Sequence, residues 1–390
     1  MTVKELALQK HYEWRGKLEV TARAKVGDME SLSLAYTPGV AEPCLEIQKD
    51  PTKSYELTRR WNTVAVITNG TAVLGLGDIG PEAGMPVMEG KCVLFKEFGG
   101  VDAIPLCVRS KNIDEIVGAV SLFAGSFGGI NLEDIAAPDC FEIERRLKEV
   151  CDIPVFHDDQ HGTAIVVGAA VINSLKLAGK RVEDCRLVIS GAGAAGTAIA
   201  DFMTALGMGE VLVCDWGKVV CEGDPELPEA LKPLAARTNR SRFKGSMRDA
   251  FKGADIFVGV SGPGIVDADM VASMNEKSIV FGMANPTPEI MPAESLAAGA
   301  FIAGSGRSDC PNQVNNVLAF PGVFRGALDV RASDINEEMK VAAAYALANF
   351  VPESELARDR VLPDAFAPGV GEAVGRAVAE AARKSGVARI

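Results

Sequence analysis

The stretch that decides the fold is Arg186-Leu187-Val188-Ile189-Ser190-Gly191-Ala192-Gly193-Ala194-Ala195-Gly196. Its β-branched start predicts a strand, and the Ala-rich residues 197–206 predict the helix that follows. Between them stands G-x-G-x-x-G, a motif that brings a helix N-terminus to the pyrophosphate of a dinucleotide. The first glycine permits the tight turn, the second lets the backbone approach the phosphates, and the third allows close helix packing. The stretch therefore predicts a dinucleotide site on residues 191–196.

Asp215 is the second feature of a dinucleotide site. The strand predicted at residues 210–214 ends at this acid, at the distance expected for a carboxylate that hydrogen-bonds the adenosine ribose. A carboxylate there repels the 2′-phosphate of NADP, so the sequence favours NAD, with NADP still possible. Two plainer interpretations stay open: the glycines and alanines serve only packing, or Asp215 is an ordinary loop acid.

Three asparagines follow the later strands of this half. Ligands of open α/β sheets bind beyond the carboxyl ends of the strands, so Asn285, Asn315 and Asn316 are placed to face the nicotinamide and the substrate. Asparagine before proline is also an ordinary turn residue, and that interpretation of Asn285 stays open. Three strands and two closing helices are predicted here, at residues 255–260, 277–283 and 300–303, then 337–351 and 371–385.

The first half reads as strands and a crossover helix, which implies a parallel, doubly wound sheet. Asn69-Gly70 is a hairpin signal, and Lys91 stands at a strand end, where a solvated lysine is the plainer interpretation. The predicted fold is thus α/β with two doubly wound domains, residues 1–160 for substrate and metal and residues 161–390 for the dinucleotide, with a helical tail. The strands expected in the first half are 62–68, 72–77, 91–96 and 101–108, and the helix is 113–123.

Two pairs of adjacent acids end two further short strands: Glu133 and Asp134, then Asp158 and Asp159. Carboxyl ends of parallel strands meet at one edge of a sheet, so the pairs could converge on one hard cation. Carboxylate oxygens of Glu133, Asp134 and Asp159 suit Mg²⁺ or Mn²⁺ and suit zinc poorly. Neighbouring residues of a strand point to opposite faces, so Glu133 and Asp134 both reach one ion only if the strand ends between them.

Zinc sites and disulfides are not expected. The nine cysteines are irregularly spaced and contain no C-x-x-C pair, which indicates reduced thiols in a cytoplasmic protein. His157 and His161 stand four apart, but in a segment expected to be strand and turn, so we interpret both as structural.

Charge and hydropathy narrow the class of partner. The chain of 390 residues has a formal charge of −12 and no basic run, which argues against a nucleic-acid surface. The N-terminus lacks the apolar region of a secretory signal, and no uninterrupted apolar run approaches the ~18 residues of a membrane span. A small-molecule substrate is the expected partner.

A divalent metal beside a nicotinamide suggests oxidation of a hydroxy acid followed by loss of CO₂. The reaction needs a base, which can be a lysine whose pKa is lowered by burial or by a nearby cation, and an acid, which can be a tyrosine. Tyr36 precedes the turn Thr37-Pro38-Gly39, which would present its hydroxyl at a loop edge. A tyrosine with its ring in a core is the plainer alternative.

Six motifs occur in the order found in malic enzymes, which the chain resembles over residues 30–330. They are Tyr36-Thr37-Pro38-Gly39-Val40, Leu74-Gly75-Leu76-Gly77-Asp78-Ile79-Gly80, Asn131-Leu132-Glu133-Asp134, His157-Asp158-Asp159-Gln160-His161-Gly162-Thr163, Ala284-Asn285-Pro286-Thr287 and Asn315-Asn316-Val317. The resemblance implies metal-dependent oxidative decarboxylation of (S)-malate to pyruvate and CO₂ with reduction of NAD(P). The chain length is similar to the short prokaryotic form, and the family suggests a homodimer built through the N-terminal helix expected at residues 3–16.

The resemblance also implies roles for single residues. Tyr36 would be the acid and Lys91 the base, with Asp158 orienting Lys91. Glu133, Asp134 and Asp159 would bind the metal, while Asn285, Asn315 and Asn316 would contact the substrate or nicotinamide. One departure is that longer members carry an arginine for a malate carboxylate where this chain has Thr71-Ala72. A metal-free hydroxyacid dehydrogenase and a dinucleotide sensor without turnover are the alternatives.

Overall fold

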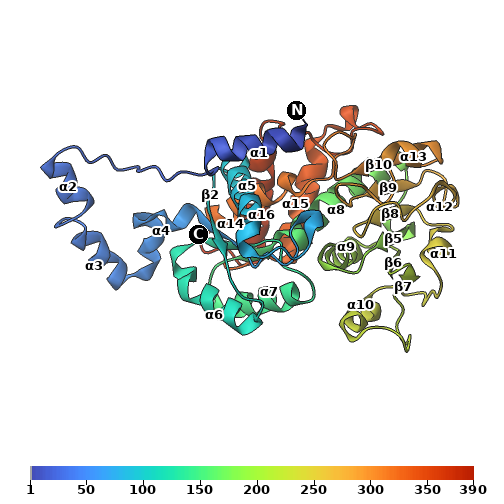
Figure 1. Cartoon of the computed structure of the whole chain (residues 1–390), viewed down its shortest axis with the longest axis horizontal. Helices are drawn as coiled ribbons and strands as arrows, with labels where there is room; N and C mark the ends of the chain where they lie inside the picture. The colour runs from blue at the N-terminus through green and yellow to red at the C-terminus, as the bar shows by residue number, and fades with distance from the viewer. Residues whose placement is uncertain (1) are drawn as a thin grey trace.

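Two separate sheets, linked by the long helix α8 (Asp158–Ala178), organise residues 2–390, the part of the chain that this computed structural model describes (Figure 1). The first sheet has strand order β2-β1-β3-β4, and every pair in it is parallel. Its strands are β1 (Thr63–Thr68), β2 (Asp102–Cys107), β3 (Gly129–Leu132) and β4 (Val155–His157).

Both faces of the first sheet are buried, as alternate residues of β1 show. Val64 and Val66 enter one core cluster together with Phe95 of α5 (Pro81–Gly99), whereas Ala65 and Ile67 enter a second cluster on the opposite face. Helices α6 (Ile113–Phe123) and α7 (Asp139–Val150) supply that second cluster. A parallel sheet with helices on both faces confirms the predicted doubly wound architecture.

Two of the strand predictions for the first half of the chain are wrong. Residues 72–77 form a loop with one 3₁₀ turn, and residues 91–96 lie in the middle of α5. The buried positions Met88, Cys92, Phe95 and Gly99 of this helix recur every three or four residues, and this helical spacing outweighs the short apolar run that suggested a strand.

The hairpin expected at Asn69-Gly70 is also absent from the described chain, because β1 pairs only with the parallel strands β2 and β3. Gly70 does turn the backbone, with a φ of 69°. The turn leads into the loop towards α5 instead of a returning strand.

The second sheet has strand order β10-β9-β8-β5-β6-β7, in which only the two-residue edge strand β7 is antiparallel. The strand order therefore reverses between β5 and β8, which is where sheets of this type bind dinucleotides. Its strands are β5 (Arg186–Ser190), β6 (Glu210–Asp215), β7 (Lys218–Val219), β8 (Ile256–Gly259), β9 (Ile279–Gly282) and β10 (Ile302–Ser305). Helices around it are α9 (Ala194–Ala205), α10 (Lys232–Arg237), α11 (Met247–Phe251), α12 (Ala268–Ala272) and α13 (Pro292–Ala297).

The C-terminal helices return to the first sheet. Helices α14 (Phe320–Asp329) and α16 (Val370–Lys384) pack on α5 and on each other, and α15 (Glu337–Phe350) packs on α8 (Figure 1). Helix α8 runs unbroken past residue 160, so the division of the chain there stays a prediction. Short 3₁₀ turns complete the chain at Pro51–Lys53, Arg59–Asn62, Leu74–Leu76, Ala124–Ser126, Val182–Asp184, Glu229–Leu231, Asn316–Leu318 and Glu353–Glu355.

Helix α8 is the one helix of residues 2–390 with the length and composition of a membrane span. In its most apolar stretch of 18 residues, 72% of the residues are buried inside the protein. Helices buried in a protein core can have the same length and apolar composition as a membrane span. The burial of α8 between the two sheets accounts for its apolar sequence.

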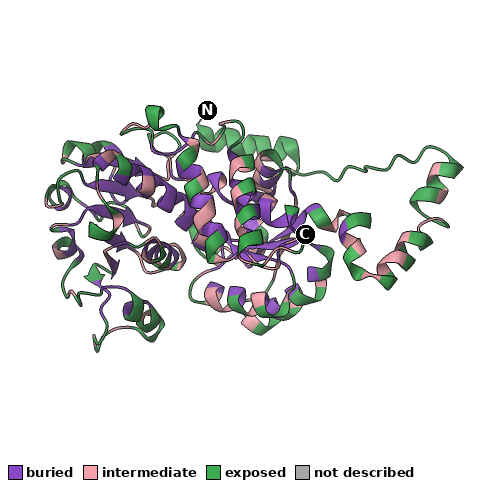
Figure 2. Cartoon of the chain, turned by 180° about the vertical axis from the view of Figure 1, so that it is seen from behind, coloured by how far each residue is buried: buried purple, intermediate pink, exposed green. Residues whose placement is uncertain are grey.

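Within the N-terminal segment, α1 lies over the body of the molecule near α5, where Lys17 hydrogen-bonds to Glu89 and Pro86, whereas α2 and α3 stand away from the body (Figure 1). The first three helices of the segment contain no buried residue, and Figure 2 shows the segment as exposed or intermediate up to α4. Tyr55 in α4 is its first buried side chain. We call residues 15–53 the N-terminal arm; the helices of the whole segment are α1 (Val3–Trp14), α2 (Met29–Ala35), α3 (Ala41–Lys49) and α4 (Ser54–Leu57).

Candidate active site

The two acid pairs meet at the carboxyl edge of the first sheet. Strands β3 and β4 are neighbours, with Leu132 opposite His157, so the residues that follow them emerge side by side. Strand β3 ends before Glu133, and Asp134 takes a φ of 52°, which turns its side chain to the same side as that of Glu133. Asp158 and Asp159 form the first turn of α8 directly, without the separate tight turn that the sequence suggested.

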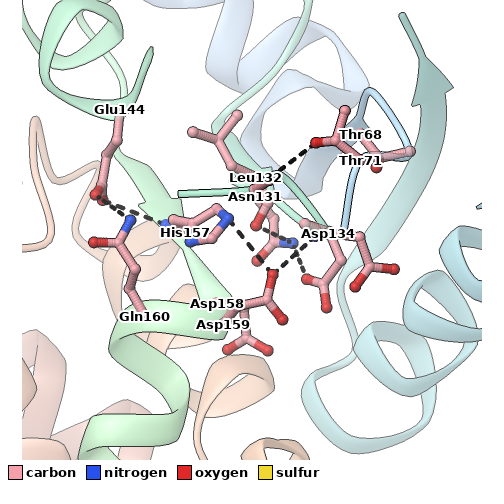
Figure 3. A network of polar contacts seen from close by, with 12 residues as sticks. Thr68, Thr71, Asn131, Leu132, Asp134, Glu144, His157, Asp158, Asp159 and Gln160 are labelled. Carbon is pink, nitrogen blue, oxygen red and sulfur yellow. Dashed lines mark hydrogen bonds and ion pairs between the residues drawn. The ribbon is translucent and has the colours of Figure 1, made fainter. Parts of the chain in front are cut away.

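Glu133, Asp134 and Asp159 form a cluster of carboxylates whose ligand atoms all lie within 4.8 Å of one another. Asp159 Oδ2 accepts a hydrogen bond of 2.8 Å from the backbone N–H of Asp134, which joins the two strand ends (Figure 3). Asn131 Nδ2 donates to Glu133 Oε2 at 2.8 Å and orients that carboxylate. Three clustered carboxylates of this kind fit a hard divalent cation such as Mg²⁺ or Mn²⁺.

Burial sets the proton affinity of these acids. It raises the pKa of Glu133 to about 7, although Lys91 acts in the opposite direction. Burial likewise raises the pKa of Asp159 to about 6. A bound cation would compete with these protons for the same oxygens.

Lys91 lies beside the carboxylate cluster, on the buried face of α5 and only 7% exposed. Its Nζ atom is 2.5 Å from Asp158 Oδ2 and 2.8 Å from Glu133 Oε1, and it sits 4.0 Å from the centroid of the Phe320 ring. Burial by itself lowers the pKa of Lys91, but Asp158 and Glu133 outweigh it and hold this pKa above its ordinary value. Burial alone therefore does not leave Lys91 with a lowered pKa, and lowering of this pKa by a nearby cation stays a prediction.

Asp158 is the centre of a second set of contacts. Its Oδ2 accepts a hydrogen bond from Asn316 Nδ2 at 2.5 Å in addition to that from Lys91. A Cβ atom on Gly162, one turn along α8, would lie 1.8 Å from Asp158 Oδ1, so only glycine leaves room for the carboxylate. Burial raises the pKa of Asp158 to about 7.

The glycine turn after β5 has the geometry expected of a dinucleotide site. Gly191 has a φ of 107°, and a Cβ there would lie 2.7 Å from the carbonyl oxygen of Val260 at the end of β8. A Cβ on Gly196 would lie 1.8 Å from the carbonyl oxygen of Gly191. Around Gly193, by contrast, no described atom lies within 4 Å of a Cβ position, so the start of α9 is open to a phosphate.

Asp215 stands at the end of β6, beside this turn. Burial raises its pKa, while the backbone N–H of Ala192 acts in the opposite direction and so faces the carboxylate. The acid and the glycine turn thus lie together at the carboxyl edge of β5 and β6.

The comparisons with known proteins agree with this arrangement. Residues 15–148 match the family described as malic enzyme, N-terminal domain, and residues 160–383 match the malic enzyme NAD binding domain. This chain belongs to the malic enzyme family. The bifunctional malic/malolactic enzyme of Bacillus subtilis is 54% identical, with 100% of this chain and 95% of the relative covered. The NAD-dependent malic enzyme of Geobacillus stearothermophilus is 52% identical, with 96% and 78% covered, and other relatives are named NADP-dependent.

Solved structures of the family share the fold. The NAD-dependent malic enzyme of Thermotoga maritima superposes with a TM-score of 0.92 at 46% identity, over 96% of this chain and 98% of that one. As a malic enzyme, the chain carries its family motifs on both sheets.

The asparagines of these malic enzyme motifs differ in what they contact. Asn316 reaches Asp158, whereas the Asn315 side chain accepts from the backbone N–H of Val317 and caps its own turn. Asn285 follows β9, and a Cβ on Gly75 would lie 2.9 Å from its carbonyl oxygen. The loop after β1 therefore lies close to the loop after β9, so loops from the two sheets approach each other at this point.

Within one chain, Tyr36 does not lie beside the carboxylate cluster of Glu133, Asp134 and Asp159. It caps the C-terminus of α2 on the N-terminal arm, and its side chain is 68% exposed. Figure 1 shows α2 at one end of the molecule, away from α8, whose first turn carries Asp158 and Asp159. The predicted acid and the predicted base of this malic enzyme thus lie apart.

Sequence reasoning quoted Asn131 in a motif without giving it a role, and it missed Phe320 and Glu144. Asn131 stands two residues before Glu133, and continuing the alternation of β3 by one residue puts the two side chains on the same side, so its role could have been found from this spacing. Phe320 and Glu144 come from α14 and α7, and no local pattern connects either helix with Lys91 or with α8.

Proposed function

We propose that this protein converts (S)-malate to pyruvate and CO₂ while reducing NAD, with NADP as the possible alternative, and that it requires Mg²⁺ or Mn²⁺. The proposal is supported most directly by the buried Lys91 standing within hydrogen-bonding distance of two carboxylates, one of which belongs to the cluster of three. A metal-free hydroxyacid dehydrogenase gives that cluster no role.

The metal would be held by Glu133, Asp134 and Asp159, and when bound it supplies Lewis-acid polarisation of the substrate oxygen and stabilises the charge left by departing CO₂. A cation held beside Lys91 would favour its neutral amine, which would then accept the hydroxyl proton of malate, and a bound nicotinamide would take up the hydride from the carbon that carries this hydroxyl. Asp158 holds Lys91 in place. Tyr36 then protonates the carbon from which CO₂ has departed, which completes pyruvate.

Cofactor binding is assigned to the glycine turn at residues 191–196, with Asp215 receiving the ribose hydroxyls and Asn285 near the nicotinamide. A carboxylate at position 215 repels a 2′-phosphate, which favours NAD. Asn316 contacts the substrate from η7, the 3₁₀ turn at Asn316–Leu318. Asn315 is the weaker candidate because its side chain already caps that turn.

We further propose a homodimer in which the N-terminal arm of one copy covers the other and delivers Tyr36 to its Lys91. Helices α2 and α3 hold no buried residue, and Met29 and Leu34 are exposed along with Tyr36. A long segment of ordered helix with exposed apolar side chains is stabilised when a second copy covers it. The separation of Tyr36 from Lys91 within one chain supports exchange of the arm.

The test is an initial-rate assay with (S)-malate and each cofactor, with and without added Mg²⁺ or Mn²⁺. Pyruvate and CO₂ formed only with the metal support the proposal. Oxaloacetate formed without metal indicates the dehydrogenase, and cofactor binding without turnover indicates a sensor. Lactate is assayed as well, because the Bacillus subtilis relative is named malic/malolactic.

A cytoplasmic location is part of the proposal. All nine cysteines are free, which suits a reducing compartment. Cell fractionation followed by the malate assay tests the location, and activity in the membrane or extracellular fraction would contradict it.

A further inference from the structure

Glu144 is a buried carboxylate outside the residues assigned to the reaction. It lies on α7 and is 6% exposed. Its two oxygens receive hydrogen bonds from the backbone N–H of His157 at 3.3 Å and from Gln160 Nε2 at 3.2 Å (Figure 3). His161 Nε2 lies 2.8 and 3.0 Å from the same two oxygens.

These donors belong to the beginning of α8. The N-cap of this helix is His157, whose side chain makes no capping hydrogen bond. Glu144, from another helix, instead accepts from the backbone N–H of this N-cap residue and from the side chains of Gln160 and His161, and its negative charge is favourable at a helix N-terminus. The stabilisation of this helix start therefore comes from tertiary contact.

The side chain of His161 is held in turn by a lysine from the C-terminal helix α15. Lys340 of α15, only 4% exposed, places its Nζ atom 3.2 Å from His161 Nδ1. A lysine ammonium can only donate, so Nδ1 must accept and the ring proton must be on Nε2, where it is donated to Glu144. Lys340 thus sets the tautomer of His161 that Glu144 requires. Glu337, one turn earlier on α15, pairs with Lys340 and helps to hold it.

The residues between these contacts are Asp158 and Asp159. Asp159 Oδ2 lies 3.5 Å from His157 Nε2 and accepts from Asp134 N, so Figure 3 shows an unbroken line of contacts from Glu144 to Asp134. If the first turn of α8 shifts, Asp159 moves away from Glu133 and Asp134.

We propose that Lys340, His161 and Glu144 are positioning residues that hold the first turn of α8 and so set the affinity for the divalent cation. The inference rests on the proposed metal dependence. Partners of metal ligands typically change metal affinity by ~10–100-fold when mutated.

The experiment titrates the full-length enzyme with Mn²⁺ alone, following free Mn²⁺ by electron paramagnetic resonance, and measures NAD binding and melting temperature in parallel. The variants are Lys340→Met, His161→Phe and His161→Gln. Lys180→Met is the matched control, because it breaks another partly buried ion pair, with Asp255, away from α8's first turn.

We expect Lys340→Met and His161→Phe to weaken Mn²⁺ binding about 10-fold or more, with NAD binding within about 2-fold of the wild type. His161→Gln should restore most of the affinity, because its amide can donate to Glu144 and accept from Lys340. Lys180→Met should leave Mn²⁺ binding unchanged.

Equal Mn²⁺ affinity in Lys340→Met and wild type overturns the inference, as does the same loss in Lys180→Met. If the wild-type enzyme itself binds no Mn²⁺, that result overturns the proposed metal dependence on which the inference rests. If Lys340→Met does not fold, Glu144→Gln decides the question, since it keeps the side-chain shape and removes one acceptor.

Discussion

Lys91 Nζ and Asp158 Oδ2 lie 2.5 Å apart and connect the middle of α5 to the first turn of α8. Both side chains are buried, so removal of Lys91 would leave the carboxylate of Asp158 without its cationic partner, whereas Lys91 would keep Glu133 if Asp158 were removed. The pair therefore ties the two helices together at the point where the carboxylates of β3 and β4 meet. The consequences can be tested at single residues.

Replacing Lys91 removes the proposed base. We expect Lys91→Ala to lower kcat about 10²–10⁴-fold, which is the usual contribution of a positioned acid or base, while NAD binding stays near that of the wild type. Lys96→Ala is the matched control, because Lys96 lies on the same helix but pairs with Asp102 at the surface. Near-normal activity of Lys91→Ala would move the role of base elsewhere.

Delivery of Tyr36 by a second copy predicts complementation. Tyr36→Phe and Lys91→Ala should each be inactive alone, whereas dimers reassembled from an equal mixture should regain about a quarter of wild-type activity, since half of the dimers carry one intact site. Rates after mixing and refolding together measure the effect. No recovery, with mixed dimers demonstrated by mass spectrometry, would place both residues in one chain.

Gly162 is required by the carboxylate of Asp158. In Gly162→Ala the new Cβ would lie 1.8 Å from Asp158 Oδ1, and that side chain cannot move without breaking its contacts with Lys91 and Asn316. We expect a loss of activity of about 10²-fold or more together with a lower melting temperature. Gly118→Ala in α6, where a Cβ meets nothing within 4 Å among the described residues, should leave activity unchanged and should not lower the melting temperature, because alanine favours a helix more than glycine does.

Cation binding should depend on pH through Glu133. Its pKa of about 7 means that a proton occupies the carboxylate below neutrality, and the cation must displace it. The affinity for Mn²⁺ should therefore rise as the pH increases from about 5.5 to about 7.5 and then level off. Isothermal titration at several pH values measures this; an affinity that is flat across the range would contradict it.

Asp215 should discriminate between the cofactors. Asp215→Ser removes the negative charge that would face a 2′-phosphate, so we expect the ratio of kcat/KM for NADP to that for NAD to rise about 10-fold. Asp224→Ser, another acid of the same domain in the loop after β7, serves as the control. An unchanged ratio would show that Asp215 does not contact the ribose.

Much of this protein could be predicted from local patterns. The glycine turn, the acid pairs and most strands were predictable because each depends on a short run of residues: a β-branched segment, a change of direction, a pair of charges. The strand predicted at residues 91–96 was wrong because six apolar and basic residues in isolation fit a strand and a helix equally well. Only the longer spacing of buried residues through α5 separates the two.

The sequence by itself determined which residues are available for chemistry and which loops carry them, because strand ends and glycine turns are encoded locally. Tertiary structure alone decided that Lys91 lies between Asp158 and Glu133, that Glu144 reaches the beginning of α8 from α7, and that Tyr36 is carried away from the site on the N-terminal arm. Each of these depends on the packing of helices distant in the chain, and such packing follows from burial of whole faces, which no short pattern of residues specifies.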